Sequence, residues 1–127
     1  MCVKKAIPEI LVSSIDRSAA FYKDLLGLEL EVLYQVDGVD QYARIGDNGF
    51  VVLLNRQPDR GDLPSGQPPA KLVFVIEGIE EHHRRLREAG QDVEDIEQSE
   101  YGTKEFAVTD PDGYRVFLVE REGEWSW

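Results

Sequence analysis

The sequence contains the same order of secondary structure twice, and this repeat limits the folds that the chain can adopt. An apolar run at residues 7–14 predicts a strand, with Glu9, Leu11 and Ser13 on one face. Asp16 is the predicted N-cap of a helix over residues 17–26, which ends before Gly27. Three further strands follow, at residues 28–36, 39–45 and 49–55.

The second half repeats this order after a period of about 60 residues. A Pro- and Gly-rich stretch at 56–69 predicts a long loop between the halves. The second half then contains a strand at 71–76, a helix at 79–89 with Ile79, Leu86 and Ala89 inward, and strands at 91–97, 103–109 and 114–120. Each half is therefore a βαβββ module, and two such modules predict an α+β fold with eight strands.

Composition excludes several classes of partner and site. The chain of 127 residues has a net charge of −11, which disfavours binding to nucleic acid and to anionic membrane surfaces. Cys2 is the single cysteine, so an internal disulfide cannot form. No signal peptide or membrane span is predicted, and the expected location is the cytoplasm. His82 and His83 are adjacent on the second helix, where we expect both on a solvated polar face.

Two segments carry a resemblance to a known family. Residues 18–27 read S-A-A-F-Y-K-D-L-L-G, and residues 102–114 read G-T-K-E-F-A-V-T-D-P-D-G-Y. Together they resemble the S-x-x-F-Y-x-x-x-L-G and G-x-x-x-F-x-x-x-D-P-D-G segments of the vicinal oxygen chelate superfamily, which includes glyoxalases, extradiol dioxygenases and bleomycin-resistance proteins. The resemblance implies one domain over residues 1–127, with modules at 6–57 and 70–121. These modules would form a curved, mixed eight-stranded sheet around a cleft.

The same resemblance identifies four positions that hold metal ligands in metal-dependent members. In this sequence they are Glu9, Leu53, Lys71 and Phe117. Leu53 and Phe117 have no lone pair to donate, and Lys71 is a cation at neutral pH. The sequence therefore predicts no metal at this place, no other cofactor and no catalytic residue. An ion pair between Glu9 and Lys71 in place of the metal is an alternative explanation for the two charges.

The resemblance also indicates which side chains face the cleft. The predicted ligand-binding residues are Glu9, Leu11, Ser13, Leu53, Lys71, Val73, Glu105 and Phe117, with Ala107 beside them. Apolar residues with a few charges are typical of small-molecule pockets. The predicted function is metal-free binding of a small, cationic or aromatic molecule such as an antibiotic, by a homodimer similar to bleomycin-resistance proteins.

Two other functions stay open at this point. One is a metal-dependent enzyme of the same superfamily, such as a glyoxalase-like lyase or isomerase or a dioxygenase, with a metal-free variant that uses Glu9 or Glu105 as a general base. The other is a non-catalytic subunit that uses its surface.

Overall fold

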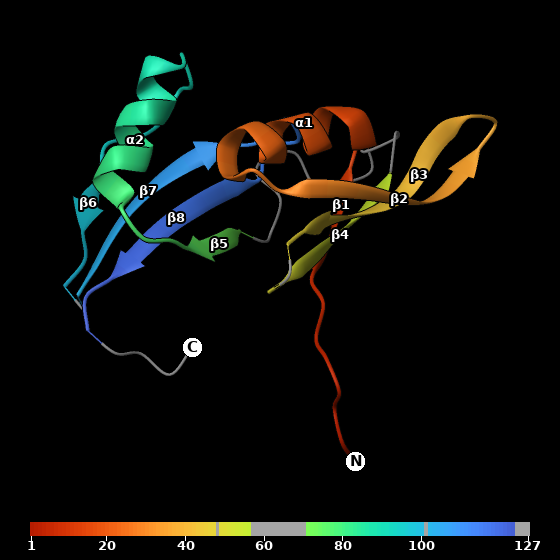
Figure 1. The fold of residues 1–127 in the computed structure, drawn as a ribbon, viewed down its shortest axis with the longest axis horizontal. Coiled ribbons are helices and arrows are strands. Elements are labelled where there is room, and N and C mark those ends of the chain that lie inside the picture. The colour runs from red at the N-terminus through yellow and green to blue at the C-terminus, as the bar shows by residue number, and fades with distance from the viewer. Residues whose placement is uncertain (48, 57–70, 101, 124–127) are drawn as a thin grey trace. The chain divides into compact units, whose positions relative to one another are not determined.

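The chain forms two compact α+β units (Figure 1). The computed structural model describes residues 1–47, 49–56, 71–100 and 102–123. The N-terminal unit is Met1–Ser65 and the C-terminal unit is Gly66–Trp127. Over the described residues, each unit contains one helix and one four-stranded sheet, which confirms the predicted α+β class and the repeat. Most of the predicted loop at 56–69 lies outside the described residues, and the module limits 6–57 and 70–121 stay predictions.

The N-terminal unit follows the predicted βαβββ order. Its elements are β1 (Glu9–Val12), α1 (Ile15–Leu26), β2 (Glu29–Val36), β3 (Val39–Gly46) and β4 (Val51–Arg56). The strands lie in the order β1-β4-β3-β2, with β1 parallel to β4 and the other pairs antiparallel. The β2–β3 turn is Asp37-Gly38, where φ is 51° and 76°, as the twist of a two-residue hairpin requires.

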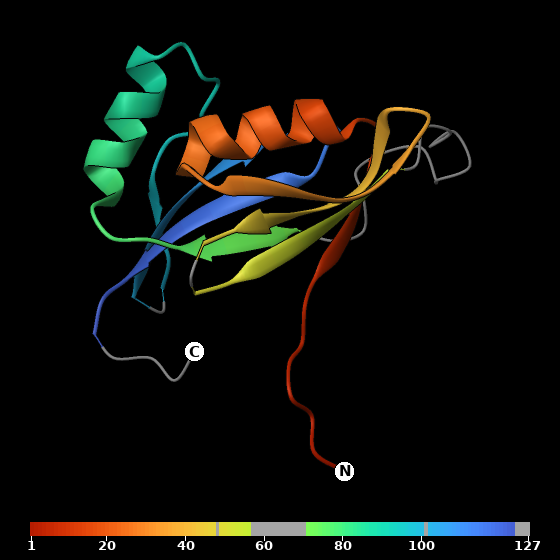
Figure 2. The same ribbon diagram turned by 45° about the vertical axis from the view of Figure 1, so that its right-hand side comes forward.

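Helix α1 covers one face of this sheet (Figure 2). Ile10 and Val12 are buried on the covered face, and Glu9 and Leu11 alternate with them, as predicted. The predicted N-cap Asp16 is wrong. Ser14 is the N-cap, because its extended backbone lets Ser14 Oγ accept the Arg17 N–H at 3.3 Å, and the helix therefore begins at Ile15. Gly27 ends it with φ 70°, as predicted.

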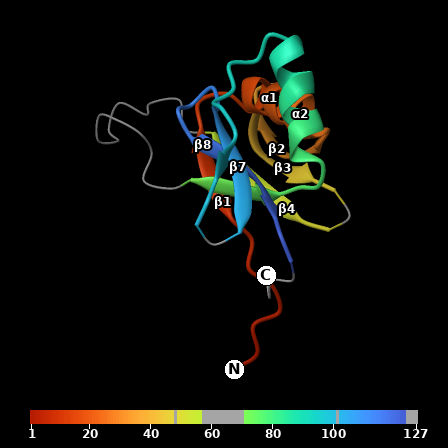
Figure 3. The same ribbon diagram turned by 90° about the vertical axis from the view of Figure 1, so that its left-hand side faces the viewer.

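The C-terminal unit repeats the arrangement, but its second strand in chain order is much shorter. Its elements are β5 (Leu72–Val75), α2 (Ile79–Glu88), β6 (Glu97–Gln98), β7 (Thr103–Thr109) and β8 (Arg115–Arg121). The strands lie in the order β5-β8-β7-β6, with β5 parallel to β8. Figure 3 shows α2 beside the β7–β8 pair, which it contacts. None of the described helices is long and apolar enough to cross a membrane.

The predicted strand at 91–97 is largely wrong. Only a single bridge, Val93 to Val108, and the two residues of β6 form there. The carbonyl oxygen of Glu94 is instead 2.9 Å from Nε2 of His83, and the Glu94 N–H donates to Ala107 at 3.1 Å. Because the Glu94 carbonyl is bonded to a helix side chain, it is not available to a strand ladder.

His83 also corrects the prediction for helix α2. His82 is exposed as expected, but His83 is 9% exposed, with its ring edge-on to Phe106 at a centroid distance of 4.9 Å. Ala89, predicted to face inward, is exposed at the helix end. His83 thus takes the inward position between Ile79 and Leu86, because its polar atom has a partner in the Glu94 carbonyl.

The segment Asp110–Gly113 forms the turn between β7 and β8. Asp110 Oδ1 accepts the N–H groups of Asp112 and Tyr114, each at 2.9 Å, and Gly113 has φ 89°. An aspartate that closes its own turn in this way fixes the β7–β8 hairpin.

A charged contact between α2 and β7 should make stability depend on pH. Lys104 Nζ donates to Glu80 Oε1 at 2.7 Å, which lowers the pKa of Glu80 and raises the pKa of Lys104. The stabilisation is lost as pH falls through the folded pKa of Glu80, below its usual 4.5, and as pH rises through that of Lys104, above its usual 10.5. The melting temperatures of wild type and Lys104→Met should therefore differ near neutral pH and converge at both extremes. A difference that is constant across thermal melts at all pH values would contradict the pairing.

Candidate functional site

Each sheet has one face away from its helix, which we call its open face. In the N-terminal sheet this face carries Glu9, Leu11, Glu31, Tyr42, Arg44, Leu53 and Asn55, because residues paired across neighbouring strands point to the same side. Glu9 pairs with Leu53, and Leu53 pairs with Arg44. The face is thus a row of polar side chains with leucines beside them.

Glu9 lies at the centre of a hydrogen-bonded group on this face. The Tyr42 hydroxyl donates to Glu9 Oε1, and Asn55 Nδ2 donates to Glu9 Oε2 at 3.4 Å. The Glu9 carboxylate, which accepts this hydrogen bond, raises the pKa of Tyr42 above its ordinary value because it stabilises the protonated hydroxyl. Donors on both oxygens orient the carboxylate while Glu9 remains exposed. Such a group can bind a cation or an N–H donor of a ligand.

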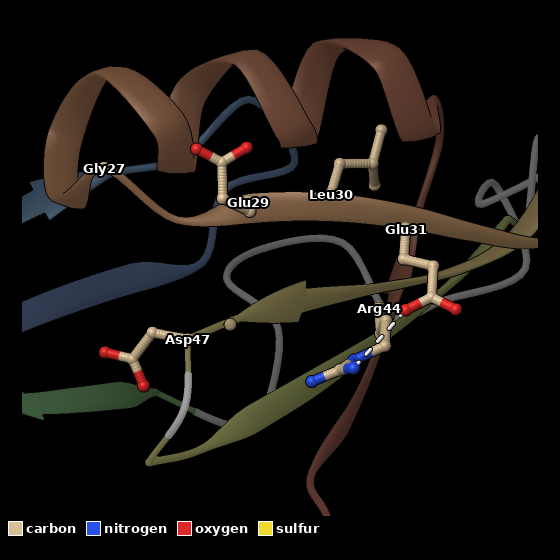
Figure 4. Close-up of a pocket in the computed structure, with 7 residues that line it drawn as sticks. Gly27, Glu29, Leu30, Glu31, Arg44 and Asp47 are labelled. Carbon is tan, nitrogen blue, oxygen red and sulfur yellow. Dashed lines mark hydrogen bonds and ion pairs between the residues drawn. The ribbon is translucent and has the colours of Figure 1, made fainter.

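A pocket of about 410 Å³ lies at one end of the same unit (Figure 4). It is lined by Gly27, Glu29, Leu30, Glu31, Arg44, Gly46 and Asp47. Glu31 and Arg44 point toward each other at 3.4 Å, while Asp47 points away from this pair (Figure 4). Three carboxylates and one guanidinium give the lining a negative charge, and the size is within the range of small-molecule sites.

The open face of the C-terminal sheet has a different chemistry. Val73 of β5 pairs with Phe117 of β8, and Phe117 pairs with Ala107 of β7. Lys71, just before β5, places Nζ 4.5 Å from the centroid of the Phe117 ring. Arg115 places its guanidinium carbon 5.0 Å from the same centroid. This face therefore combines an aromatic ring with two cations.

The predicted residues form two groups, one in each unit. Glu9 is beside Leu53, while Leu11 pairs with Asn55 and Ser13 follows β1. Lys71, Val73 and Phe117 lie together, and Glu105 lies along β7, where Thr103 Oγ1 donates to it at 3.2 Å. The ion pair between Glu9 and Lys71 stays a prediction, because these residues belong to different units.

Sequence reasoning missed five polar residues of the open faces on which the site depends. They are Glu31, Tyr42, Arg44, Asn55 and Arg115. Each is two residues from another residue of its face, so strand alternation applied to Leu53 and Phe117, which the resemblance named, could have found Asn55 and Arg115. Tyr42 and Arg44 alternate with the buried Ala43 and Ile45 in the same way.

Comparison with known proteins identifies the family. Residues 6–118 match the family model described as the glyoxalase/bleomycin resistance protein/dioxygenase superfamily. The chain belongs to this superfamily. Searching the curated proteins gave no significant match.

Solved structures of this superfamily share the fold. A glyoxalase-related enzyme from Clostridium phytofermentans is 21% identical, with a TM-score of 0.76 over 96% of this chain and 98% of that one. A bleomycin-binding protein complexed with bleomycin is 18% identical, with a TM-score of 0.68 over 94% and 100%. Lactoylglutathione lyase from Agrobacterium tumefaciens is 19% identical, with a TM-score of 0.66 over 94% and 95%. The fold is thus common to binding proteins and enzymes, and site residues must separate them.

The superfamily includes metal-dependent enzymes, and the resemblance implies four metal-ligand positions in this chain. The residues at these positions do not suit a divalent metal. Glu9 offers a carboxylate, but its neighbour Leu53 has no donor atom. Lys71 places a positive charge over Phe117, which also has no donor atom. A divalent cation needs three or four neutral or anionic ligands, and these residues do not fit one. The described residues contain no group of three or more His, Cys, Asp or Glu side chains suited to a metal.

Proposed function

We propose that the protein binds a small molecule and that the open face of the N-terminal sheet contacts a cationic group of this ligand. The Glu9 carboxylate, oriented by Tyr42 and Asn55, is the observation that carries the proposal. An exposed carboxylate that is already oriented can form a charge-assisted hydrogen bond to a ligand cation. It loses little further conformational freedom when the ligand binds.

At this face, the charge of the surroundings supports a cationic group of the ligand over an anionic one. The pocket beside this face carries Glu29, Glu31 and Asp47 against Arg44 alone. The whole chain has a net charge of −11, so a cation is attracted during approach as well. The bleomycin-binding relative offers one example of a drug-sized ligand on this fold, and an antibiotic is accordingly one candidate ligand.

Binding is favoured over metal-dependent chemistry because of the replaced ligand positions. Lactoylglutathione lyase shares the fold and represents the enzyme alternative. At the positions where the family resemblance implies metal ligands, this chain has Leu53, Lys71 and Phe117, none of which ligates a divalent cation at neutral pH. Stoichiometric Zn²⁺, Ni²⁺, Mn²⁺ or Fe²⁺ in the purified protein, lost in Glu9→Gln, would contradict the proposal. We also propose that the protein is a homodimer in the cytoplasm, which light scattering and cell fractionation test.

Glu9→Gln should weaken the binding of a cationic drug. Isothermal titration with bleomycin is expected to give a Kd at least tenfold higher for this variant, about 1.4 kcal/mol. The amide keeps the size of the side chain and removes the charge that pairs with the ligand.

Asp24→Asn is the matched control, because Asp24 is exposed on α1, away from the open face. It removes one negative charge from the same unit and should change the Kd by less than about twofold, the effect of distant screened charges. Equal losses in the two variants would show that net charge, rather than Glu9, attracts the ligand. No binding of bleomycin by the wild type would rule out this antibiotic as a ligand.

A further inference from the structure

The open face of the C-terminal sheet places two cations side by side on one aromatic ring. Leu72 pairs with Val116 in the parallel β5–β8 ladder, so the preceding residues, Lys71 and Arg115, are neighbours on the same face. Lys71 Nζ and the guanidinium carbon of Arg115 lie 4.5 and 5.0 Å from the centroid of the Phe117 ring. Neighbouring like charges repel, so this arrangement is favoured when an anion lies between them.

The carboxylates of the unit leave one of these cations uncompensated. Glu94 forms an ion pair with Arg115. Among the described residues of the C-terminal unit, no carboxylate forms an ion pair with Lys71, whose side chain is exposed. The group Lys71, Arg115 and Glu94 thus carries one net positive charge, within a chain whose net charge is −11. A ligand with a single negative charge matches this local excess.

Apolar surface continues from the cations along β5. Val73 and Val75 are 44% and 47% exposed, and they pair with Phe117 and Val119 on the same side of the sheet. An anion that binds at Lys71 can therefore place an apolar body over these valines. Removing apolar surface from water on both partners then adds to the charge contact.

We propose that this face binds a small organic carboxylate with an aromatic or apolar body, whose carboxylate is held by Lys71 and Arg115. This deepens the proposed small-molecule binding and rests on it, since it adds an anionic group to the chemistry that the protein recognises. A carboxylate is favoured over a dianionic phosphate because Arg115 already shares its charge with Glu94. The net negative charge of the chain opposes the anion only weakly at physiological salt, where charges beyond about 8 Å are screened.

Three probes of nearly equal shape test the proposal on the full chain. Benzoate, benzamide and benzamidine carry negative, zero and positive charge on the same phenyl ring. In two-dimensional ¹H–¹⁵N NMR titrations at 150 mM salt, benzoate is expected to shift the amides of 72–75 and 115–119 saturably. Benzamide should bind there at least tenfold more weakly. Equal affinities for benzoate and benzamide, or benzoate shifts confined to the N-terminal unit, would overturn the proposal.

Variants at two lysines separate the local charge from the total charge. Lys71→Met should raise the Kd for benzoate at least tenfold, while Lys71→Arg should stay within threefold of wild type. Lys104→Met removes the same charge on the helix-covered side, where Lys104 is paired with Glu80, and should leave the Kd within twofold. Equal Kd values for Lys71→Met and Lys104→Met would overturn the assignment, provided both spectra keep the dispersion of the folded protein.

Titration with benzamidine tests the proposed cation site at Glu9 separately. Benzamidine is expected to shift amides around Glu9 and Tyr42 in the N-terminal unit, in wild type and in Lys71→Met alike. Loss of that response with benzoate binding intact would contradict the cation site alone. The reverse result would contradict the carboxylate site alone.

Discussion

Leu54→Ala should lower the free energy of unfolding by about 2–5 kcal/mol, the range for deleting a buried leucine side chain. Leu54 is 0% exposed on the face of β4 that α1 covers, where it pairs with Ala43 and Ile10. The truncation leaves a cavity that the surrounding strands and helix fill only in part. Urea denaturation followed by circular dichroism measures the change.

Leu53→Ala is the matched control for this prediction. Leu53 is the adjacent residue of the same strand, half-buried on the open face between Glu9 and Arg44. Because the Leu53 side chain already contacts solvent, its truncation removes less buried apolar surface and should lower the free energy of unfolding by less than about 1.5 kcal/mol. Equal losses of stability at the two positions, or a larger loss at Leu53, would contradict the assignment of Leu54 to the face that α1 covers and of Leu53 to the open face.

The sequence predicted best where local chemistry and periodicity agree. Asp37-Gly38, Gly27 and Asp110–Gly113 each have residue types suited to a special backbone geometry, and each turns or ends an element. The alternation along β1 also placed Ile10 on the face opposite Glu9 and Leu11, where it is buried. These features depend on residues within a few positions of one another, so a linear sequence contains them.

Predictions were wrong where a tertiary contact decided the outcome. His83 reads as a polar helix residue, yet it is buried because the carbonyl of Glu94, eleven positions away, supplies its hydrogen bond. The same contact takes Glu94 out of a regular strand. Ser14 rather than Asp16 caps α1, because the cap depends on which residue has an extended backbone. Ser and Asp are both favoured at the N-cap, so the residue types alone do not show which of the two positions begins the helix.

The candidate site was predicted in part. The family resemblance named Glu9, Leu53, Val73 and Phe117, and the strand register pairs Glu9 with Leu53 and Val73 with Phe117. The hydrogen bonds from Tyr42 and Asn55 to Glu9 join residues from three strands, and only their register brings them together. The approach of Arg115 and Lys71 to one ring likewise depends on the parallel β5–β8 pairing.

Gly46→Ala should destabilise the N-terminal unit by about 1–3 kcal/mol or more, the usual cost of forcing atoms into filled space. A Cβ at Gly46 would lie 2.2 Å from the carbonyl oxygen of Phe50 and 3.1 Å from Cα of Val51. Both are backbone atoms, and the Phe50 carbonyl also accepts the Asp47 N–H at 3.2 Å. Relief of the clash therefore requires β3 and β4 to separate at the turn that joins them.

Gly49→Ala in the same turn should behave in the opposite way. The nearest atom to a Cβ at Gly49 is Asp47 Oδ1, at 3.4 Å, and its φ lies outside the left-handed region. Alanine there restricts the unfolded chain and should be neutral or stabilising by up to about 1 kcal/mol. Urea denaturation of both variants gives the comparison.

Gly46 also lines the pocket in Figure 4, so its substitution connects stability to the candidate site. Separation of β3 from β4 would move Arg44, which pairs with Leu53 across these strands and with Glu31 on β2. The amide signals of Glu31, Arg44 and Leu53 should therefore shift in Gly46→Ala and stay in place in Gly49→Ala. If Gly46→Ala were as stable as the wild type, the close approach of Gly46 to Phe50 would be absent. The geometry of the pocket that depends on this approach would then also be incorrect.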